Sequence, residues 1–205
     1  DSLNWLGLQW SEPLLFQSER TGVYKNAIQK LLDNGAAYRC FLTREELDQA
    51  RKEAQGKGGD FRVPKTYRDM PLQDQKRLLN AGQSFTLRLK IPPGKTLFKD
   101  HIYGAITVNN EEIDDFIIAR SDGTPTYNFT VVVDDHAMGI SHVIRGEDHI
   151  SNTPKQLLIY WALGYPVPEF AHLPMILGPD KKRLSKRHGA AGIQEFRDAG
   201  YAADA

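Results

Sequence analysis

A segment near the C-terminal end gathers the side chains best suited to chemistry on an anion. Residues 181–189 combine a run of cationic groups with a serine and a glycine, namely Lys181, Lys182, Arg183, Ser185, Lys186, Arg187, His188 and Gly189. Closely spaced positive charges in a loop suit a polyphosphate, because they neutralise charge that builds up on a transferred group. A solvated surface charge run or a nuclear-localisation-like stretch has the same composition, and composition alone favours that plainer interpretation.

A second group of ionisable residues follows a short stretch that reads as a strand, 142–145. It consists of Arg145, Glu147, Asp148 and His149. Ligands bind beyond the carboxyl ends of strands in open parallel sheets, so these side chains could line a site. A capped strand-to-helix turn with solvated charges explains them equally well, and the residues alone leave both interpretations open.

Other reactive side chains have structural explanations. Asp134, Asp135 and His136 could hold a metal, but no second cluster has ligand spacing, so we expect a helix C-cap or turn. His172 lies in an apolar stretch and is expected to be a core histidine with satisfied hydrogen bonds. Cys40 is the single cysteine and cannot form an internal disulfide or a structural zinc site, so we expect a small buried residue.

Composition indicates an ordinary globular protein of 205 residues, with 40% hydrophobic and 25% charged residues. Lys plus Arg and Asp plus Glu are both 26, so a nucleic-acid partner would have to bind through local patches rather than global charge. No apolar run is long enough to predict a membrane span, and the N-terminus does not resemble a signal peptide. We therefore expect a cytoplasmic protein without a membrane partner.

The first third of the chain is expected to form helices. Apolar residues recur at helical spacing from 23 to 32, and Gly35 follows where a left-handed C-cap would lie. Thr43 and Glu46 form a capping-box pattern that predicts the start of a second helix.

The middle of the chain is expected to form a small α+β insert. Alternating apolar and polar residues from 85 to 91 predict a half-buried strand. Further short strands are expected around Leu97, 102–108 and 116–119.

The last third predicts an α/β arrangement. A strand at 142–145 is followed by a helix that begins near 151–153 and ends at Gly164, and a second strand is predicted at 172–177. The segment 127–133 is ambiguous, since its β-branched residues favour a strand while its place before another strand suits a helix.

Several blocks together resemble the bacterial-type glutamyl-tRNA synthetases, which are class I aminoacyl-tRNA synthetases. RLSKR at 183–187 resembles their "KMSKS" loop. The other blocks that carry the resemblance are 3–8, 17–20, 121–129, 131–136, 142–149 and 152–154. The likeness runs along nearly the whole chain, in order and at consistent spacing.

The resemblance implies an α/β fold, the second half of the class I Rossmann-like catalytic fold with an inserted α+β domain. It implies four regions: the end of the first half of the nucleotide-binding fold at 1–37, a connective insert that binds the tRNA acceptor end at 38–120, the second half with the KMSKS-like loop at 121–190, and the start of a stem-contact region at 191–205.

The implied reaction has two steps. ATP, accompanied by Mg²⁺, activates L-glutamate to glutamyl-adenylate, and the 3′ end of tRNA-Glu then takes the glutamyl group. We expect a monomer.

The resemblance also implies roles for particular residues. Lys186 would stabilise charge on the departing pyrophosphate, with Ser185 and Arg187 shaping the loop. Tyr127 and Arg145 would bind glutamate, Arg145 as a bidentate partner of a carboxylate. The residues facing the adenosine or the tRNA end would be Glu147, Asp148, Arg183 and Lys186.

Three departures from the family pattern carry expectations. The histidine-rich "HIGH" signature is absent, and it supplies half of the ATP site, so we expect this chain alone to be inactive. Phe41 and Leu42 follow Cys40 where many relatives have a second cysteine, so no zinc is predicted. The chain also lacks an anticodon-binding domain, which suggests a fragment of the catalytic region.

Three alternatives compete with the ligase. A glutamyl-transferring paralogue that acts on a tRNA base fits the block at 183–189 less well. A non-catalytic tRNA-binding fragment should show steeply salt-dependent binding and no effect of glutamate. A generic nucleotide-binding domain does not explain the blocks around Tyr127 and Arg145.

Overall fold

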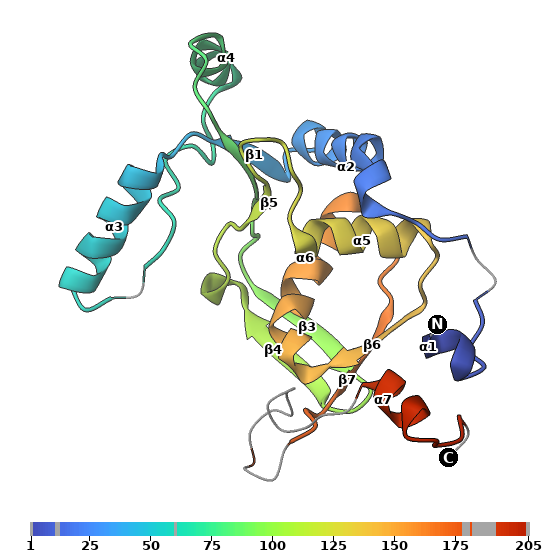
Figure 1. Cartoon of the computed structure of the whole chain (residues 1–205). Helices are drawn as coiled ribbons and strands as arrows, with labels where there is room; N and C mark the ends of the chain where they lie inside the picture. The colour runs from blue at the N-terminus through green and yellow to red at the C-terminus, as the bar shows by residue number, and fades with distance from the viewer. Residues whose placement is uncertain (1, 11–12, 60, 178–180, 182–191, 204–205) are drawn as a thin grey trace.

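The computed structural model describes residues 2–10, 13–59, 61–177, 181 and 192–203. It has an α/β architecture with two small sheets and helices around them (Figure 1). The helices are α1 (Ser2–Trp5), α2 (Thr21–Asp33), α3 (Arg44–Gly56), α4 (Leu72–Asn80), α5 (Tyr127–Ala137), α6 (Thr153–Leu163) and α7 (Ile193–Asp198), with 3-10 turns η1 (Gln17–Glu19), η2 (Asn110–Glu112) and η3 (Glu147–Asn152). The strands are β1 (Ala37–Cys40), β2 (Thr86–Leu89), β3 (Lys95–Asp100), β4 (Gly104–Asn109), β5 (Ile117–Ala119), β6 (His142–Gly146) and β7 (Glu169–Leu173).

The strands divide between the sheets in a way that joins distant parts of the chain. One antiparallel sheet has the order β1-β2-β5, and the other has the order β4-β3-β7-β6. Strands β6 and β7 are parallel and are linked through α6, while the antiparallel hairpin β3–β4 meets β7 in parallel through a single pair, Asp100 with Phe170. Part of the predicted insert therefore extends the sheet of the last third. The boundaries at 38 and 120 remain a prediction.

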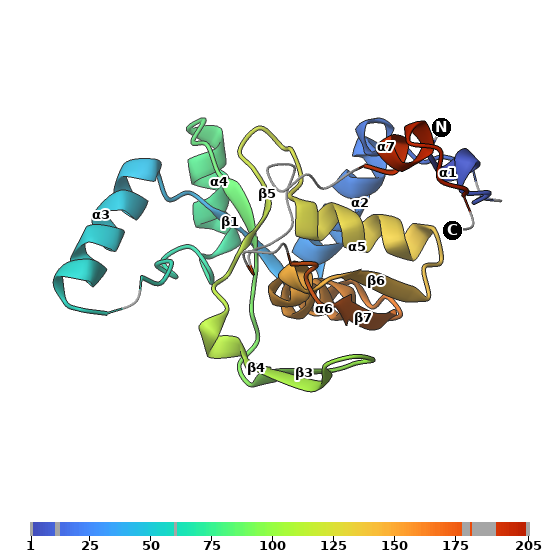
Figure 2. The ribbon, with the colours of Figure 1, turned by 60° about the horizontal axis from the view of Figure 1, so that its bottom comes forward.

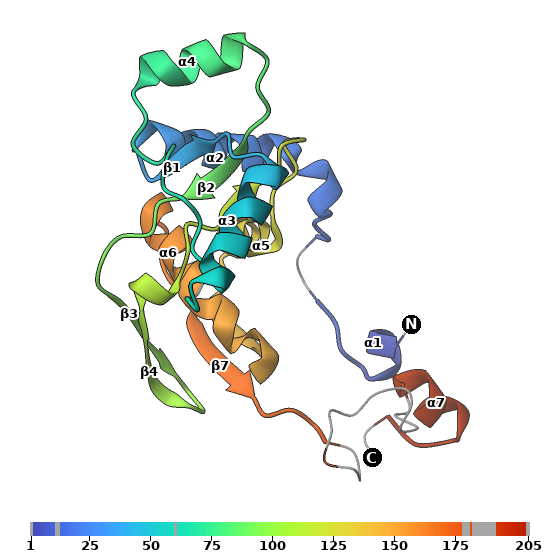
Figure 3. The same cartoon turned by 90° about the vertical axis from the view of Figure 1, so that its left-hand side faces the viewer.

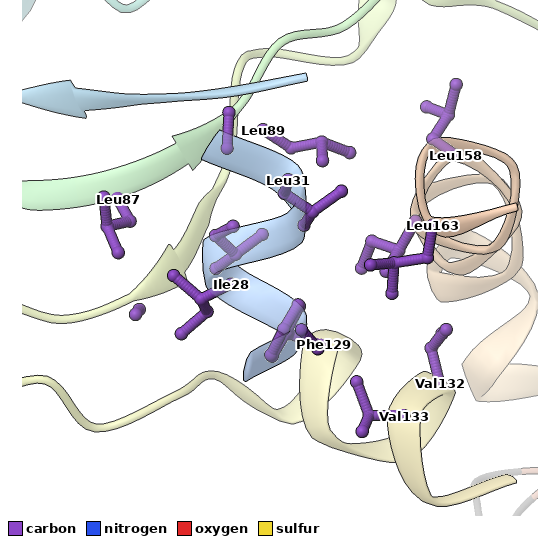
Figure 4. Packing of buried hydrophobic residues seen from close by; sticks show 14 of the residues in the cluster. Ile28, Leu31, Leu87, Leu89, Phe129, Val132, Val133, Leu158 and Leu163 are labelled. Carbon is purple, nitrogen blue, oxygen red and sulfur yellow. The ribbon is translucent and has the colours of Figure 1, made fainter. Parts of the chain in front are cut away.

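One hydrophobic core holds α2, α5, α6 and the three-stranded sheet together. Figure 4 shows its side chains converging from these elements: Ile28, Leu31, Leu87, Leu89, Phe129, Val132, Val133, Leu158 and Leu163. A second, smaller cluster of Phe98, Leu157 and Phe170 seals the β3–β4 hairpin against α6 and β7. The second cluster packs the hairpin against the first residues of β7, next to the parallel pair of Asp100 with Phe170.

Several predicted elements are confirmed. Helix α2 is followed by Gly35 at a φ of 73°. The capping box of α3 is present, with the Thr43 side chain accepting from the Glu46 backbone N–H and the Glu46 carboxylate accepting from Thr43. Helix α6 ends at Gly164, whose φ of 67° places it in the left-handed conformation.

The ambiguous segment at 127–133 is a helix. Phe129, Val132 and Val133 are buried at three- and four-residue spacing on one face of α5. Packing of this face into the core outweighs the weak β preference of the branched residues. Asp134 to His136 accordingly lie in the last turn of this helix.

Three strand predictions were wrong in detail. The alternation at 85–91 does not give a half-buried strand, because Arg88 is buried and donates from Nη1 to the Asp115 carbonyl at 2.6 Å. The strand predicted at 102–108 begins at Gly104, after a turn that requires a positive φ there. The strand predicted at 172–177 is Glu169–Leu173, since Pro174 lacks the N–H needed to continue the ladder.

Helices α3 and α4 extend away from the core and contribute no buried residue to it (Figures 1 and 2). The short helices α1 and α7 lie side by side on another part of the molecule, joined by a 3.3 Å hydrogen bond from Ser2 to Gln194 (Figures 2 and 3). No helix in the described ranges combines the length and apolar character needed to cross a membrane.

The shared core predicts that β2 and α6 unfold together. Leu89 is 1% exposed, so Leu89→Ala should lower the free energy of unfolding by about 2–5 kcal/mol. Hydrogen exchange should show the amides of α6 losing protection together with those of β2. Leu97→Ala, at a position that is 61% exposed, is the control and should change little. Loss of protection confined to 38–120 would contradict a common core.

Candidate active site

The site lies at the carboxyl ends of β6 and β7. These strands pair in parallel, with Arg145 opposite His172 and Gly146 opposite Leu173. The turn η3 and the start of α6 follow directly after β6. The arrangement brings polar side chains from β6, β7, η3 and α6 to one edge of the sheet, where α/β folds bind ligands.

Arg145 is held in one orientation by four hydrogen bonds. Its Nε donates to His172 Nε2 at 3.1 Å. Its Nη2 contacts Thr153 Oγ1 at 2.8 Å, Gln156 Oε1 at 2.9 Å and the His149 carbonyl at 3.4 Å. Three of these acceptors are uncharged oxygens and the fourth is a ring nitrogen, and within the described part of the chain Arg145 forms no ion pair.

Burial lowers the pKa of Arg145, and attraction to Tyr127 and Asp135 opposes this shift. Tyr127 begins α5 and is 53% exposed, with its ring centroid 6.0 Å from that of His149. Arg145 and Tyr127, for which the family resemblance implies one pocket, attract each other electrostatically.

A buried acid lies behind Arg145. Asp100 Oδ2 is 2.6 Å from His172 Nδ1, and both side chains are completely shielded from solvent. Burial alone would raise the pKa of Asp100, but hydrogen bonds from the Tyr103 N–H, the His172 side chain and the Ile102 N–H outweigh it and lower the pKa to about 2. Asp100 is therefore ionised at neutral pH, and His172 is a core histidine with every ring nitrogen bonded, as predicted.

Glu147 and Asp148 occupy the turn after β6. The Glu147 carboxylate accepts from the Tyr103 hydroxyl and, at 3.0 Å, from the Met175 N–H. The bond from Tyr103 is the main reason why the pKa of Glu147 is lowered. The Asp148 carboxylate folds back over Gly146, where an added Cβ would come within 2.7 Å of Asp148 Oδ1.

A cavity of about 500 Å³ opens beside Tyr127. Its lining residues come from η1, α2, the 120–125 turn and α5 and include Gln17, Tyr24, Lys25, Arg120, Asp122 and Tyr127. Asp134 fixes the lining residue Tyr24 by accepting from its hydroxyl at 2.8 Å, and it also accepts from Arg20 Nε at 2.7 Å. Burial and this bond raise the pKa of Tyr24 to about 12.

The family model of "tRNA synthetases class I (E and Q), catalytic domain" matches residues 1–205. This chain belongs to that family. The predicted fold class is confirmed by solved structures of this class I family, since the glutamate tRNA ligase of Elizabethkingia meningosepticum, crystallised in complex with its amino acid, superposes with a TM-score of 0.86 at 33% identity. The match covers 98% of this chain and 47% of that one.

Curated relatives in this class I synthetase family are similar along the whole chain. The glutamate–tRNA ligase of Coprothermobacter proteolyticus is 52% identical over 100% of this chain and 44% of its own length. Those of Geobacter sulfurreducens and Aquifex aeolicus are 53% and 51% identical and are covered to 42% and 43%. The chain thus spans less than half the length of these relatives.

Part of the predicted synthetase site lies outside the described residues. Arg183, Ser185, Lys186 and Arg187 all fall between 182 and 191. Their predicted roles rest on the sequence motif alone.

Within the described ranges, one group of side chains could hold a metal ion: His101, His142 and Glu169. It lies at the amino ends of β6 and β7, opposite the end that carries Arg145. Glu169 already pairs there with His101. The residues at 134–136 form no such group.

Sequence reasoning did not assign a site role to three side chains that surround Arg145 or its partner His172: Asp100, Thr153 and Gln156. A polar Gln156 within the apolar helix 153–163 was a usable signal, because a buried amide needs a partner. Asp100 gave no signal, since its partner His172 is 72 positions away.

The low pKa of Asp100 predicts a specific acid sensitivity. Folding lowers this pKa from 3.8 to about 2, so the ionised group contributes stability above pH 3.8 that is lost as the pH falls toward 2. Unfolding free energies from pH 5 to pH 2 should therefore fall by about 2 kcal/mol less in Asp100→Asn than in the wild type. Parallel pH curves for the two proteins would contradict an ionised Asp100.

Proposed function

We propose that this chain supplies the glutamate-binding part, together with part of the ATP site, in the catalytic domain of a glutamate–tRNA ligase. The observation that carries the proposal is Arg145, a half-buried cation with neutral hydrogen-bond partners and no paired carboxylate in the described ranges. A desolvated cation with no carboxylate in direct contact keeps much of its attraction for anions, so a site of this kind suits an anionic ligand. Identity of about half to named glutamate–tRNA ligases supports glutamate as that ligand.

Arg145 would bind a glutamate carboxylate, with Tyr127 beside it. The Nε and Nη2 atoms are engaged by protein acceptors, and no hydrogen bond of Nη1 occurs among the described residues, so its hydrogens would serve Tyr127 and the ligand. A bidentate contact would require the ligand to compete with Thr153 or Gln156. Fixing the donor in advance reduces the entropy that binding costs.

The remaining roles follow the sequence motifs. Glu147, Asp148 and Arg183 would face the adenosine or the tRNA end. Lys186 would stabilise the leaving pyrophosphate, with Ser185 and Arg187 shaping the loop. Mg²⁺ would enter with ATP, held largely by phosphate oxygens.

The proposed chemistry joins these groups in two transfers. A carboxylate oxygen of glutamate attacks the α-phosphate of ATP, the bond to the β-phosphate breaks, and glutamyl-adenylate and pyrophosphate form. The terminal ribose hydroxyl of tRNA-Glu then attacks the glutamyl carbonyl and AMP leaves. The region 38–120 would hold the acceptor end. A cytoplasmic monomer without zinc remains part of the proposal.

ATP–pyrophosphate exchange with glutamate and tRNA-Glu tests the activity. It should be measured on this chain and on a chimaera in which the chain replaces the matching segment of the Aquifex aeolicus relative. We expect exchange by the chimaera and none by the chain alone. Lys186→Ala should lower the exchange rate by at least about 100-fold with little change in glutamate affinity. The reason is that the lysine would stabilise negative charge that develops on the pyrophosphate only in the transition state.

Lys182→Ala is the matched control, since it removes a lysine from the same basic segment outside the RLSKR motif. Equal rates for the two variants would refute the role of Lys186. Binding of tRNA by the chimaera with no exchange would instead favour a tRNA-binding module.

Arg145→Ala in the chimaera should reduce kcat/KM for glutamate by at least about 100-fold, because a desolvated carboxylate would lose its charged donor. Its preference for glutamate over glutamine should fall as well. Arg88→Ala removes another buried arginine that does not touch Arg145, and it controls for lost stability. Unchanged preference in Arg145→Ala would exclude Arg145 from the glutamate site.

A further inference from the structure

We propose that Asp100 and His172 are positioning residues that fix the direction in which Arg145 presents its guanidinium to the substrate. The inference deepens the proposed function and rests on it for the identity of the substrate. It assigns part of the amino-acid specificity to a carboxylate that lies on the β3–β4 hairpin, away from the ligand.

The first link is the immobilisation of Asp100. Its Oδ1 accepts from the backbone N–H groups of Ile102 and Tyr103 at 3.0 Å each and from that of His172 at 3.3 Å. Its Oδ2 is left for the imidazole of His172. The side chain is thus held by three backbone donors and has no solvent-exposed surface.

The second link is the tautomer of His172. An ionised Asp100 is only an acceptor, so His172 Nδ1 must carry the proton and donate it. Arg145 Nε is only a donor, so His172 Nε2 must be the unprotonated acceptor. Thr153 also contacts Nε2, at 3.1 Å. A neutral ring with its proton on Nδ1 satisfies both neighbours, whereas the other tautomer satisfies neither.

The third link is the orientation of Arg145. Its guanidinium is planar, so the bond from Nε to His172 and the bonds from Nη2 to Thr153 and Gln156 fix its plane. The ring of Phe170 supports it, with Arg145 Cζ 5.8 Å from the ring centroid. The Phe170 ring is in turn nearly parallel to that of His172. Rotation of His172 would release both the Nε bond and this stacking.

The hairpin also reaches the other half of the site. Tyr103, three residues after Asp100, donates to Glu147. The hairpin therefore contacts Glu147, which is proposed for ATP or the tRNA end, and reaches Arg145 only through His172. The two contacts can be separated experimentally, because only Asp100 leads to Arg145.

Asp100→Asn in the chimaera tests the positioning role, with Asp115→Asn as the matched control. Asp115 is also buried, pairs with Arg68 and accepts from the Ile91 N–H at 2.9 Å, and none of these partners is a hydrogen-bond partner of Arg145. Asp100→Asn should raise KM for glutamate by about 10- to 100-fold, leave KM for ATP within about twofold, and reduce discrimination against glutamine. Asp115→Asn should leave both KM values within about twofold.

Equal effects of Asp100→Asn on both substrates, or equal effects of the two variants on glutamate, would overturn the positioning role. His172→Gln, which keeps an acceptor oxygen, should retain more glutamate affinity than His172→Leu. Equal loss in these two variants would also count against the proposal.

A measurement without substrate separates this inference from the proposed function. In the ¹⁵N-labelled chain, the imidazole nitrogens of His172 should report a proton on Nδ1 and an unprotonated Nε2 at neutral pH. A protonated Nε2 would refute the Asp100–His172–Arg145 arrangement whatever the enzyme does. The expected tautomer together with a chimaera that lacks exchange would instead show that the arrangement exists and that the proposed function is wrong.

Discussion

The rest of this site depends on one partly desolvated guanidinium, that of Arg145, which has no ion-pair partner among the described residues. Arg145 cannot lose its charge, and burial makes that charge expensive. The fold offsets this cost with four acceptors that carry no negative charge, and with the Asp100 carboxylate, which lies on the far side of the His172 ring. Because no carboxylate in the described part of the chain forms an ion pair with Arg145, its attraction for an external carboxylate is preserved.

The elements around Arg145 follow from this requirement. Strands β6 and β7 supply Arg145 and His172 as opposite residues, α6 supplies Thr153 and Gln156 from its first turns, and β3 supplies Asp100 at its last position. The single parallel pair between β3 and β7 lies at Asp100, so the hairpin joins the sheet where its carboxylate is needed. The buried side chains of Phe98, Leu157 and Phe170 shield this junction from solvent.

The sequence predicted local features well and long-range ones poorly. The capping box at Thr43, the left-handed caps at Gly35 and Gly164 and the strand of Arg145 follow from short-range chemistry, which a single segment contains. The helix at 127–137 was left open because its β-branched residues conflict with a burial pattern that only the core explains. Resemblance indicated Tyr127 and Arg145, but Asp100 could not be found, because a buried carboxylate and its partner share no local pattern.

The charge arrangement also limits how the amino-acid preference of this fold could be redesigned. Asp100 and Arg145 form a pair of opposite charges separated by a neutral ring, so together they leave no net charge in the interior. Replacing Arg145 by a neutral residue would leave the buried Asp100 carboxylate without an opposite charge nearby. Replacing Asp100 by a neutral residue would likewise leave the Arg145 guanidinium without one. A route toward an uncharged amino acid would therefore have to alter two residues that lie 45 positions apart, in different strands, at the same time.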